Sequence, residues 1–139
     1  MIKLAESESE IAACYPPMKQ LRPDIEESQF ISQVLRQGEV GYRLAYLPGE
    51  DLAQCVAGFR IFEMLSRKSH MYVDDLVTLE TGRSRGHGAA MIEWLAGYAK
   101  QQGCRRMDLD ATVSNAAAHS FYYANGLAVI SFHFSRQLS

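Results

Sequence analysis

The amino-acid sequence predicts an α/β domain with a mixed sheet, because segments with the two-residue period of strands alternate with segments of helical period. The chain has 139 residues, a length that suits one hydrophobic core. Apolar residues make up 47% and charged residues 22%, the balance of an ordinary globular protein. No repeat or linker-like segment interrupts the sequence, so we expect a single domain over residues 1–139.

The first half of the chain predicts a short strand, two helices and an antiparallel hairpin. Pro16-Pro17 interrupts the first helix, whereas the second runs with helical spacing until Gly38. After residue 40 the period becomes two, and Pro48-Gly49 marks a turn between two extended stretches. In order, we expect a strand in 2–7, helices in 7–21 and 22–38, and the extended stretches in 41–51 and 52–65.

The second half continues the alternation of strands and helices. Residues 71–79 are rich in β-branched and aromatic side chains, and residues 88–103 form a helix of about four turns that Gly103 closes. Beyond it we expect a strand in 104–112, a helix in 114–126 and a final strand or hairpin in 127–138.

Glycine and arginine concentrate in the stretch TGRSRGHG, residues 81–88, directly before the long helix. The first amides of a helix lack intrahelical partners and carry partial positive charge, and glycines allow a phosphate to approach closely. Arg83 and Arg85 can add charge-assisted hydrogen bonds, so the stretch predicts a phosphate or pyrophosphate site. A P-loop would need Gly-Lys-Ser/Thr, and a dinucleotide fingerprint would need glycine in place of Met91; neither pattern is present. A glycine-rich surface turn is the alternative.

Two motifs together resemble the signatures of the GNAT superfamily of N-acetyltransferases. The first is R-x-x-G-x-G, from Arg83 to Gly88. The second is N-x-x-A-x-x-F-Y followed by N-G-L, formed by Asn115, Ala118, Phe121, Tyr122, Asn125, Gly126 and Leu127. Leucine at the last position replaces the family's phenylalanine. The resemblance covers essentially the full length, and it implies a mixed, mostly antiparallel central sheet flanked by about four helices, with splayed fourth and fifth strands.

The resemblance also implies an acetyl-CoA-dependent N-acetyltransferase, in which a primary amine attacks the thioester directly in a ternary complex. The glycine-rich loop would hold the cofactor's pyrophosphate, and the fourth strand would pair with pantetheine through its backbone. Carried over position by position, the cofactor-binding residues are Leu76, Val77, Thr78, Arg83, Arg85, Gly86, His87, Gly88, Ala89 and Asn115. For Asn115, capping of the helix that follows it is an equally good reading.

Three residues are candidates for catalysis. Tyr122 matches the family's tyrosine that protonates the departing thiolate, a role that suits a phenol; a core aromatic is the alternative. Asp74 and Asp75 are adjacent carboxylates in an apolar strand, where burial is costly, and they point to opposite faces unless a bulge intervenes. A similar acidic pair in diamine acetyltransferases binds the cationic substrate and helps to deprotonate it. The alternative is an exposed carboxylate or an ion pair with Arg60 or Arg105.

Composition limits the partners and the location. A net charge of −2 gives no general field for nucleic acid or anionic membranes, and no apolar run approaches the roughly 18 residues of a membrane span. The N-terminus lacks a signal-like segment, so we expect a cytoplasmic protein. The three cysteines form no CxxC pair and the four histidines are scattered, so we expect no metal site.

We expect a small-molecule amine, such as a cationic molecule or polyamine, as acceptor in preference to a protein. A homodimer is expected by analogy, with the aromatic C-terminal segment as an interface. Two other functions stay open, a non-catalytic acyl-CoA-binding or sensor domain on the same fold and a generic nucleotide-binding module.

Overall fold

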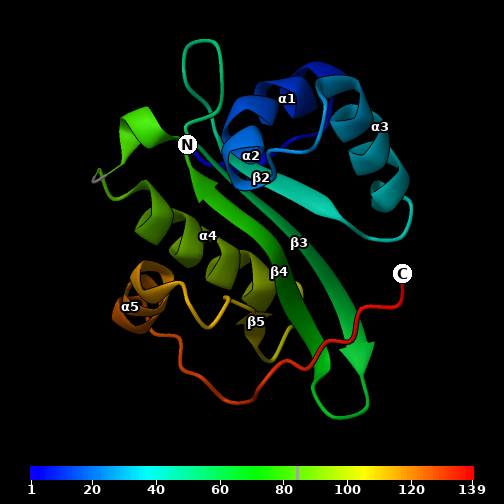
Figure 1. Ribbon diagram of the computed structural model, residues 1–139, viewed down its shortest axis with the longest axis vertical. Coiled ribbons are helices and arrows are strands. Elements are labelled where there is room, and N and C mark those ends of the chain that lie inside the picture. Colours follow the sequence, from blue (N-terminus) through cyan, green and yellow to red (C-terminus); the bar gives the residue numbers. More distant parts are fainter. Residues whose placement is uncertain (84) are drawn as a thin grey trace. The chain divides into compact units, whose positions relative to one another are not determined.

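Figure 1 shows the computed structural model of the chain, in which residues 1–83 and 85–139 are described. The chain divides into two compact units, Met1–Leu109 and Asp110–Ser139. In order, the first unit contains β1 (Lys3–Leu4), α1 (Glu8–Ala13), α2 (Tyr15–Leu21), α3 (Glu27–Gly38), β2 (Arg43–Leu47), β3 (Cys55–Met64), β4 (Lys68–Thr78), the 3₁₀ turn η1 (Glu80–Gly82), α4 (His87–Gln101) and β5 (Met107–Leu109). The second unit contains α5 (Ala116–Ala124).

The sheet confirms the predicted mixed α/β class. Its five strands within the described residues lie in the order β1-β2-β3-β4-β5. The pairs β1–β2, β2–β3 and β3–β4 are antiparallel, whereas β4 and β5 are parallel. The long hairpin of β3 and β4 forms the centre of the unit, and α4 is the crossover that makes the parallel pair possible.

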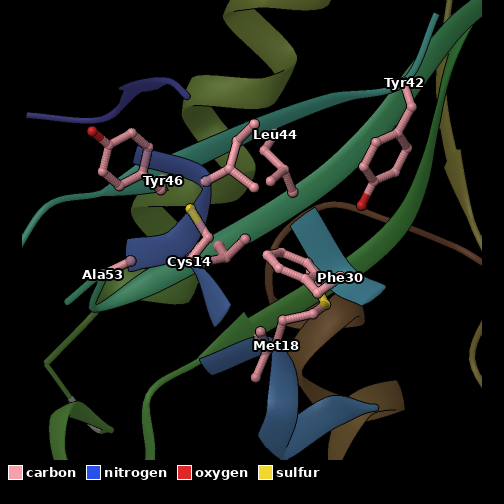
Figure 2. Packing of buried hydrophobic residues seen from close by; sticks show 10 residues of the cluster. Cys14, Met18, Phe30, Tyr42, Leu44, Tyr46 and Ala53 are labelled. Atoms are coloured by element: carbon pink, nitrogen blue, oxygen red, sulfur yellow. The ribbon is translucent and has the colours of Figure 1, made fainter. Parts of the chain in front are cut away.

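Helices cover both faces of this sheet (Figure 1). Successive strand residues belong to different cores, because Leu44 packs with the N-terminal helices and Ala45 packs with α4. Figure 2 shows the first core, where Cys14 at the junction of α1 and α2 packs with Met18 of α2 and Phe30 of α3. They meet Tyr42, which directly precedes β2, and Leu44 and Tyr46 of β2. The second core joins Met91, Leu95 and Ala99 of α4 to Phe59, Met71 and Val73. A sheet covered twice explains why residues 55–59 are all buried instead of alternating.

Local signals set the helix boundaries. Ser7 caps α1 in a capping box with Glu10, and Pro16-Pro17 occupies the first turn of α2, where a missing amide proton costs nothing. The predicted interrupted helix in 7–21 is therefore two helices that meet at Cys14. No helix in the described part of the chain is long and apolar enough to cross a membrane.

The C-terminal segment differs from its prediction. Residues 127–138 have the alternation of a strand, yet they form neither strand nor helix in the structure as described. A strand is stable only when a neighbour pairs with its backbone, and α5 is the regular element described in this unit. The apolar side chains of the alternating pattern, Ile130, Phe132 and Phe134, are 55%, 79% and 90% exposed. The predicted strand in 104–112 is confirmed only over Met107–Leu109.

Candidate active site

A β-bulge brings the two adjacent carboxylates to the same side of the sheet. Asp75 is opposite Gly58 and Val73 is opposite Phe59, so that Asp74 is an extra residue on β4. Such a residue breaks the alternation of side chains between the two faces. Asp74 and Asp75 accordingly line one cavity of about 320 Å³. From the sequence, both acids could share a site only if a bulge lay between them, and the structure contains that bulge.

The cavity lies between β4 and the helices α2 and α3. The helices α2 and α3 and the turn between them contribute all of its apolar lining, together with Arg22, Gln33 and Gln37, and β4 contributes the acids. The apolar residues are Met18, Ile25, Phe30 and Val34, and the polar ones are Arg22, Gln33, Gln37, Tyr42, Tyr72, Asp74 and Asp75. A concave site with an apolar wall and a few convergent polar groups is typical of small-molecule binding.

Asp75 is held at both carboxylate oxygens. Arg22, at the end of α2, donates from Nε and Nη2 to Oδ1 over 3.0 and 2.7 Å, and the Tyr42 hydroxyl donates to Oδ2 over 2.8 Å. Arg22 Nη2 also donates to the main-chain oxygen of Asp74 over 3.2 Å. Burial, and then the charge of Asp75, raise the pKa of Tyr42 far above its usual range, so its hydroxyl stays a donor. These contacts fix Asp75 and compensate its charge.

Gly58 makes the contact between Tyr42 and Asp75 possible. The Tyr42 ring lies directly over Gly58, and a β-carbon at that position would overlap the hydroxyl. Tyr42 is 5% exposed and packed in the first core, so moving it aside would disturb that packing and break its bond to Asp75. An isolated glycine inside a strand is a known sign of a bulge or a close approach, and both occur here.

Gly58→Ala is expected to destabilise the fold by about 3 kcal/mol, because overpacking adds to the loss of a buried hydrogen bond. Urea unfolding followed by circular dichroism measures the change. Gly97→Ala is the matched control, since Gly97 is exposed in α4 and an added β-carbon meets nothing within 4 Å. A Gly58→Ala protein as stable as the control would contradict this packing.

Asp74 has a different environment from Asp75. Arg60 Nε donates to its Oδ1 over 3.0 Å, which confirms the ion pair that the sequence offered as an alternative. Burial raises the pKa of Asp74 above its ordinary 3.8, and Arg60 opposes that rise. A carboxylate whose pKa is raised by burial is a better proton acceptor than an ordinary one. Of the two acids, Asp74 therefore fits a base and Asp75 fits a positioning group.

The predicted anion loop precedes α4 as expected. Gly86 is the N-cap residue and adopts a left-handed conformation with φ +78°, which suits glycine and strains other residues. The first intrahelical bond runs from the amide of Ala90 to the carbonyl of Gly86. The amides of His87, Gly88 and Ala89 thus have no helical partner, and no side chain of the described residues caps them.

The side chains around this loop fit an anion. Arg83 and Arg85 are exposed on either side of Ser84, which lies outside the described residues. His87 is half-buried next to Gly82, and its Nδ1 is buried without a hydrogen-bond partner among the residues described. The loop therefore combines the partial positive charge of the free helix amides, the full charges of the two arginines and the unpartnered Nδ1 of His87.

On its way to the anion loop, β4 extends beyond the residues that pair with β5. The pairing with β5 covers only Met71–Val73, whereas β4 continues to Thr78 with β3 alone as its partner in the described structure. The resemblance predicts that the fourth and fifth strands splay apart, and the end of their pairing at Val73 is compatible with that prediction. Leu76 and Val77 pack into opposite cores, and the carbonyl of Thr78 accepts a bond from Gln20 Nε2 over 3.1 Å.

The second predicted motif lies in the second unit and defines a helix with both ends fixed. Asn115 Oδ1 accepts from the amide of Ala118 over 3.1 Å, so the capping alternative is observed for Asn115. At the other end Gly126 has φ +86°, and the amide of Leu127 bonds to the carbonyl of Tyr122 over 3.0 Å. Tyr122 is half-buried beside Phe121, and burial raises its pKa.

The predicted site residues therefore divide between the two units. The acids, the β4 backbone and the anion loop belong to the first unit, and Asn115 and Tyr122 belong to the second. Sequence reasoning missed Arg22 and Tyr42. They lie 53 and 33 residues from Asp75 along the chain, and no local pattern connects residues at such separations.

Comparison with known proteins identifies the fold and the family. The sequence matches the acetyltransferase (GNAT) family over residues 5–127. It is 25% identical to the uncharacterized N-acetyltransferase YhdJ of Bacillus subtilis over 123 residues, 87% of this chain and 86% of that one.

Two solved structures have the same fold at low sequence identity. An acetyltransferase of Trypanosoma brucei has a TM-score of 0.81 at 17% identity, with 99% of each chain covered. The aminoglycoside N-acetyltransferase AAC(6')-Iy, solved in complex with CoA, has a TM-score of 0.80 at 16% identity, with 99% of this chain and 95% of that one covered. Since the family match spans most of the sequence and includes both motifs, this chain belongs to the acetyltransferase (GNAT) family of acyltransferase enzymes.

Proposed function

We propose that this protein transfers the acetyl group of acetyl-CoA to a primary amine by direct attack in a ternary complex. One observation carries the proposal. A single stretch of β4 begins at the carboxylate cavity with Asp74, continues without a β5 partner to Thr78, and leads through η1 to the anion loop. An acceptor site and a donor site thus lie at the two ends of one extended stretch of β4, which rises about 3.3 Å per residue.

On the donor side, the free amides at the start of α4 would bind the pyrophosphate, with Arg83 and Arg85 adding charge. Pantetheine would pair with the β4 backbone between Leu76 and Thr78, where an amide can polarise the acetyl carbonyl. Asn115 Oδ1 caps α5, and the amide nitrogen of this side chain would donate to the cofactor. The CoA complex of the aminoglycoside N-acetyltransferase with the same fold supports CoA as the donor.

On the acceptor side, the amine must lose a proton to become a nucleophile. Asp74 would take that proton, directly or through water, while Asp75 stays fixed by Arg22 and Tyr42. The amine nitrogen then bonds to the acetyl carbon, and the bond from that carbon to sulfur breaks. The thiolate receives a proton from Tyr122, whose raised pKa keeps it protonated at neutral pH.

A thermal-shift experiment tests the donor. CoA and acetyl-CoA are expected to raise the melting temperature, because a ligand at 100 times its Kd stabilises the native state by about 2.7 kcal/mol. ATP and NAD are expected to have smaller effects at the same concentration. A shift with ATP or NAD and none with either CoA compound would favour a nucleotide-binding module and contradict the proposal.

Tyr122→Phe distinguishes an enzyme from a non-catalytic acyl-CoA-binding domain. Loss of a positioned acid typically costs about 10²-fold or more, so we expect kcat to fall by that order while acetyl-CoA affinity changes less than about threefold. Stopped assays for free thiol and isothermal titration measure the two quantities. Turnover equal to wild type at every pH would remove Tyr122 from the mechanism.

We also propose a homodimer in which residues 130–138 contribute to the interface. The exposed alternation of Ile130, Phe132 and Phe134 supports it, because an extended apolar segment is stabilised by pairing with another chain. A monomeric mass by light scattering at micromolar concentration would contradict this assembly.

A further inference from the structure

Both acids of the acceptor cavity already form ion pairs within the protein. Each carboxylate has an arginine of its own, Arg22 at 2.7 Å from Asp75 and Arg60 at 3.0 Å from Asp74. The lining contains no further acid among the described residues. A polyamine or an aminoglycoside carries several ammonium groups and needs several unpaired negative charges in its site. Arg60 lies outside the lining, so the lining itself has two carboxylates and one guanidinium group, which suits a ligand with one positive charge better than a polyamine with several.

The apolar part of the lining comes from α2, α3 and the turn between them, and the protein core supports it. Met18 and Phe30 are 3% and 4% exposed and belong to the first core, against which Ile25 and Val34 also pack. These four side chains line the cavity from α2, the turn after it and α3, and form what we call the α2–α3 wall. An apolar group gains free energy by leaving water for such a surface, whereas a hydroxylated group loses hydrogen bonds there.

Part of the remaining polar lining is occupied by bonds within the protein. Gln33 Nε2 donates to Gln37 Oε1 over 2.6 Å, so these two amides satisfy one another in part. Arg22 is committed to Asp75 through both Nε and Nη2, and would have to leave it to bind the carboxylate of an amino acid. The volume of about 320 Å³ is at the small end of ligand sites, which range over about 300–1,000 Å³.

From these observations we infer that the acceptor is a small monoamine with an aryl or branched alkyl substituent. Its nitrogen lies at Asp74, and its apolar group packs on the α2–α3 wall. The inference rests on the proposed acetyl transfer for the fate of the amine, but the binding of such an amine in this cavity follows from the lining alone.

A panel of four amines tests the acceptor class. Phenethylamine carries one charge and an aryl group, ethanolamine carries the same charge without an apolar group, spermidine is a polycation, and phenylalanine adds a carboxylate. With saturating acetyl-CoA, we expect kcat/KM for phenethylamine to exceed each of the other three by at least tenfold. Equal or greater kcat/KM for spermidine, ethanolamine or phenylalanine would overturn the inference and leave acetyl transfer itself established.

Two aspartate variants of α3 test the wall. Val34→Asp places a carboxylate in the cavity lining, and Leu35→Asp places the same charge on the next residue, which is 47% exposed and outside the lining. We expect Val34→Asp to lower kcat/KM for phenethylamine at least tenfold, while Leu35→Asp stays within twofold of wild type. Val34→Ala with Leu35→Ala serves as a milder pair if the aspartate destabilises the core. An equal response of the two positions in both pairs would overturn the inference.

Binding without turnover separates this inference from the proposed function. Saturation-transfer NMR in the presence of CoA reports binding of phenethylamine whether or not it is acetylated. Binding that depends on Val34, in a protein that acetylates no amine, would support the cavity assignment and overturn acetyl transfer. An absence of binding and of acetylation, in a protein whose melting temperature CoA raises, would overturn the cavity assignment.

Discussion

Gly86→Ala is expected to weaken CoA binding at least tenfold. Gly86 has φ +78° at the N-cap of α4, a conformation that costs an alanine about 1–2 kcal/mol. If the backbone relaxes to relieve that strain, the amides of His87, Gly88 and Ala89 turn away from the position in which they converge on an anion. Isothermal titration with CoA measures the affinity, and urea unfolding measures the accompanying loss of stability.

Gly97→Ala is the control within the same helix. Its β-carbon would meet nothing within 4 Å, and replacing a helical glycine by alanine stabilises by roughly 0.5–1 kcal/mol. CoA affinity should be unchanged in this variant. A Gly86→Ala protein that binds CoA as tightly as Gly97→Ala would show that the α4 N-terminus is not the pyrophosphate site.

Asp74→Asn is expected to reduce kcat by about 10²-fold or more, because asparagine keeps the shape of the side chain but cannot accept the amine's proton. Asp75→Asn should reduce kcat by less than tenfold and act mainly on KM and stability, since Asp75 is held by Arg22 and Tyr42 and has a positioning role. Steady-state kinetics with both variants decides between the acids. A larger loss of kcat in Asp75→Asn would reverse the assignment.

The dependence of kcat/KM on pH is a second test of Asp74 as the base. A base must be deprotonated, so kcat/KM should fall as pH falls through the pKa of Asp74, which burial places above 3.8. Arg60 and Arg22 face Asp74 and lower that pKa, whereas Asp75 raises it, so Arg60→Gln should move the acidic limb to higher pH. The raised pKa also means that this carboxyl's contribution to stability is present below 3.8 and is lost as pH rises through the folded pKa.

Much of the fold was predictable because its signals are local. Proline positions, glycines after helices and the change of period near residue 41 each act within a few residues, and they locate α2, α3, α4 and the hairpin of β2 and β3. The position of the glycine-rich loop at the start of α4 was predictable for the same reason, since a helix N-terminus and its glycine are neighbours in sequence. The motif around Tyr122 has a local explanation too, with Asn115 and Gly126 fixing the two ends of α5.

The features that escaped prediction depend on contacts between distant segments. The bulge at Asp74 exists because of how β4 pairs with Gly58, and the state of Asp75 depends on Arg22 and Tyr42 from two other elements. The strand predicted in 127–138 failed for a related reason. Alternating side chains give a segment the capacity to be a strand, but a paired neighbour is what makes it one.

The most direct test is the product of one reaction. Purified protein, acetyl-CoA and phenethylamine are incubated together, and free thiol and the mass of the amine product are followed in parallel with the Asp74→Asn protein. We expect one thiol released for each N-acetylated amine formed, at a rate at least 10²-fold lower in Asp74→Asn. Tight binding of acetyl-CoA with no acetylated product from any amine of the panel would contradict catalysis and identify a non-catalytic acyl-CoA-binding domain.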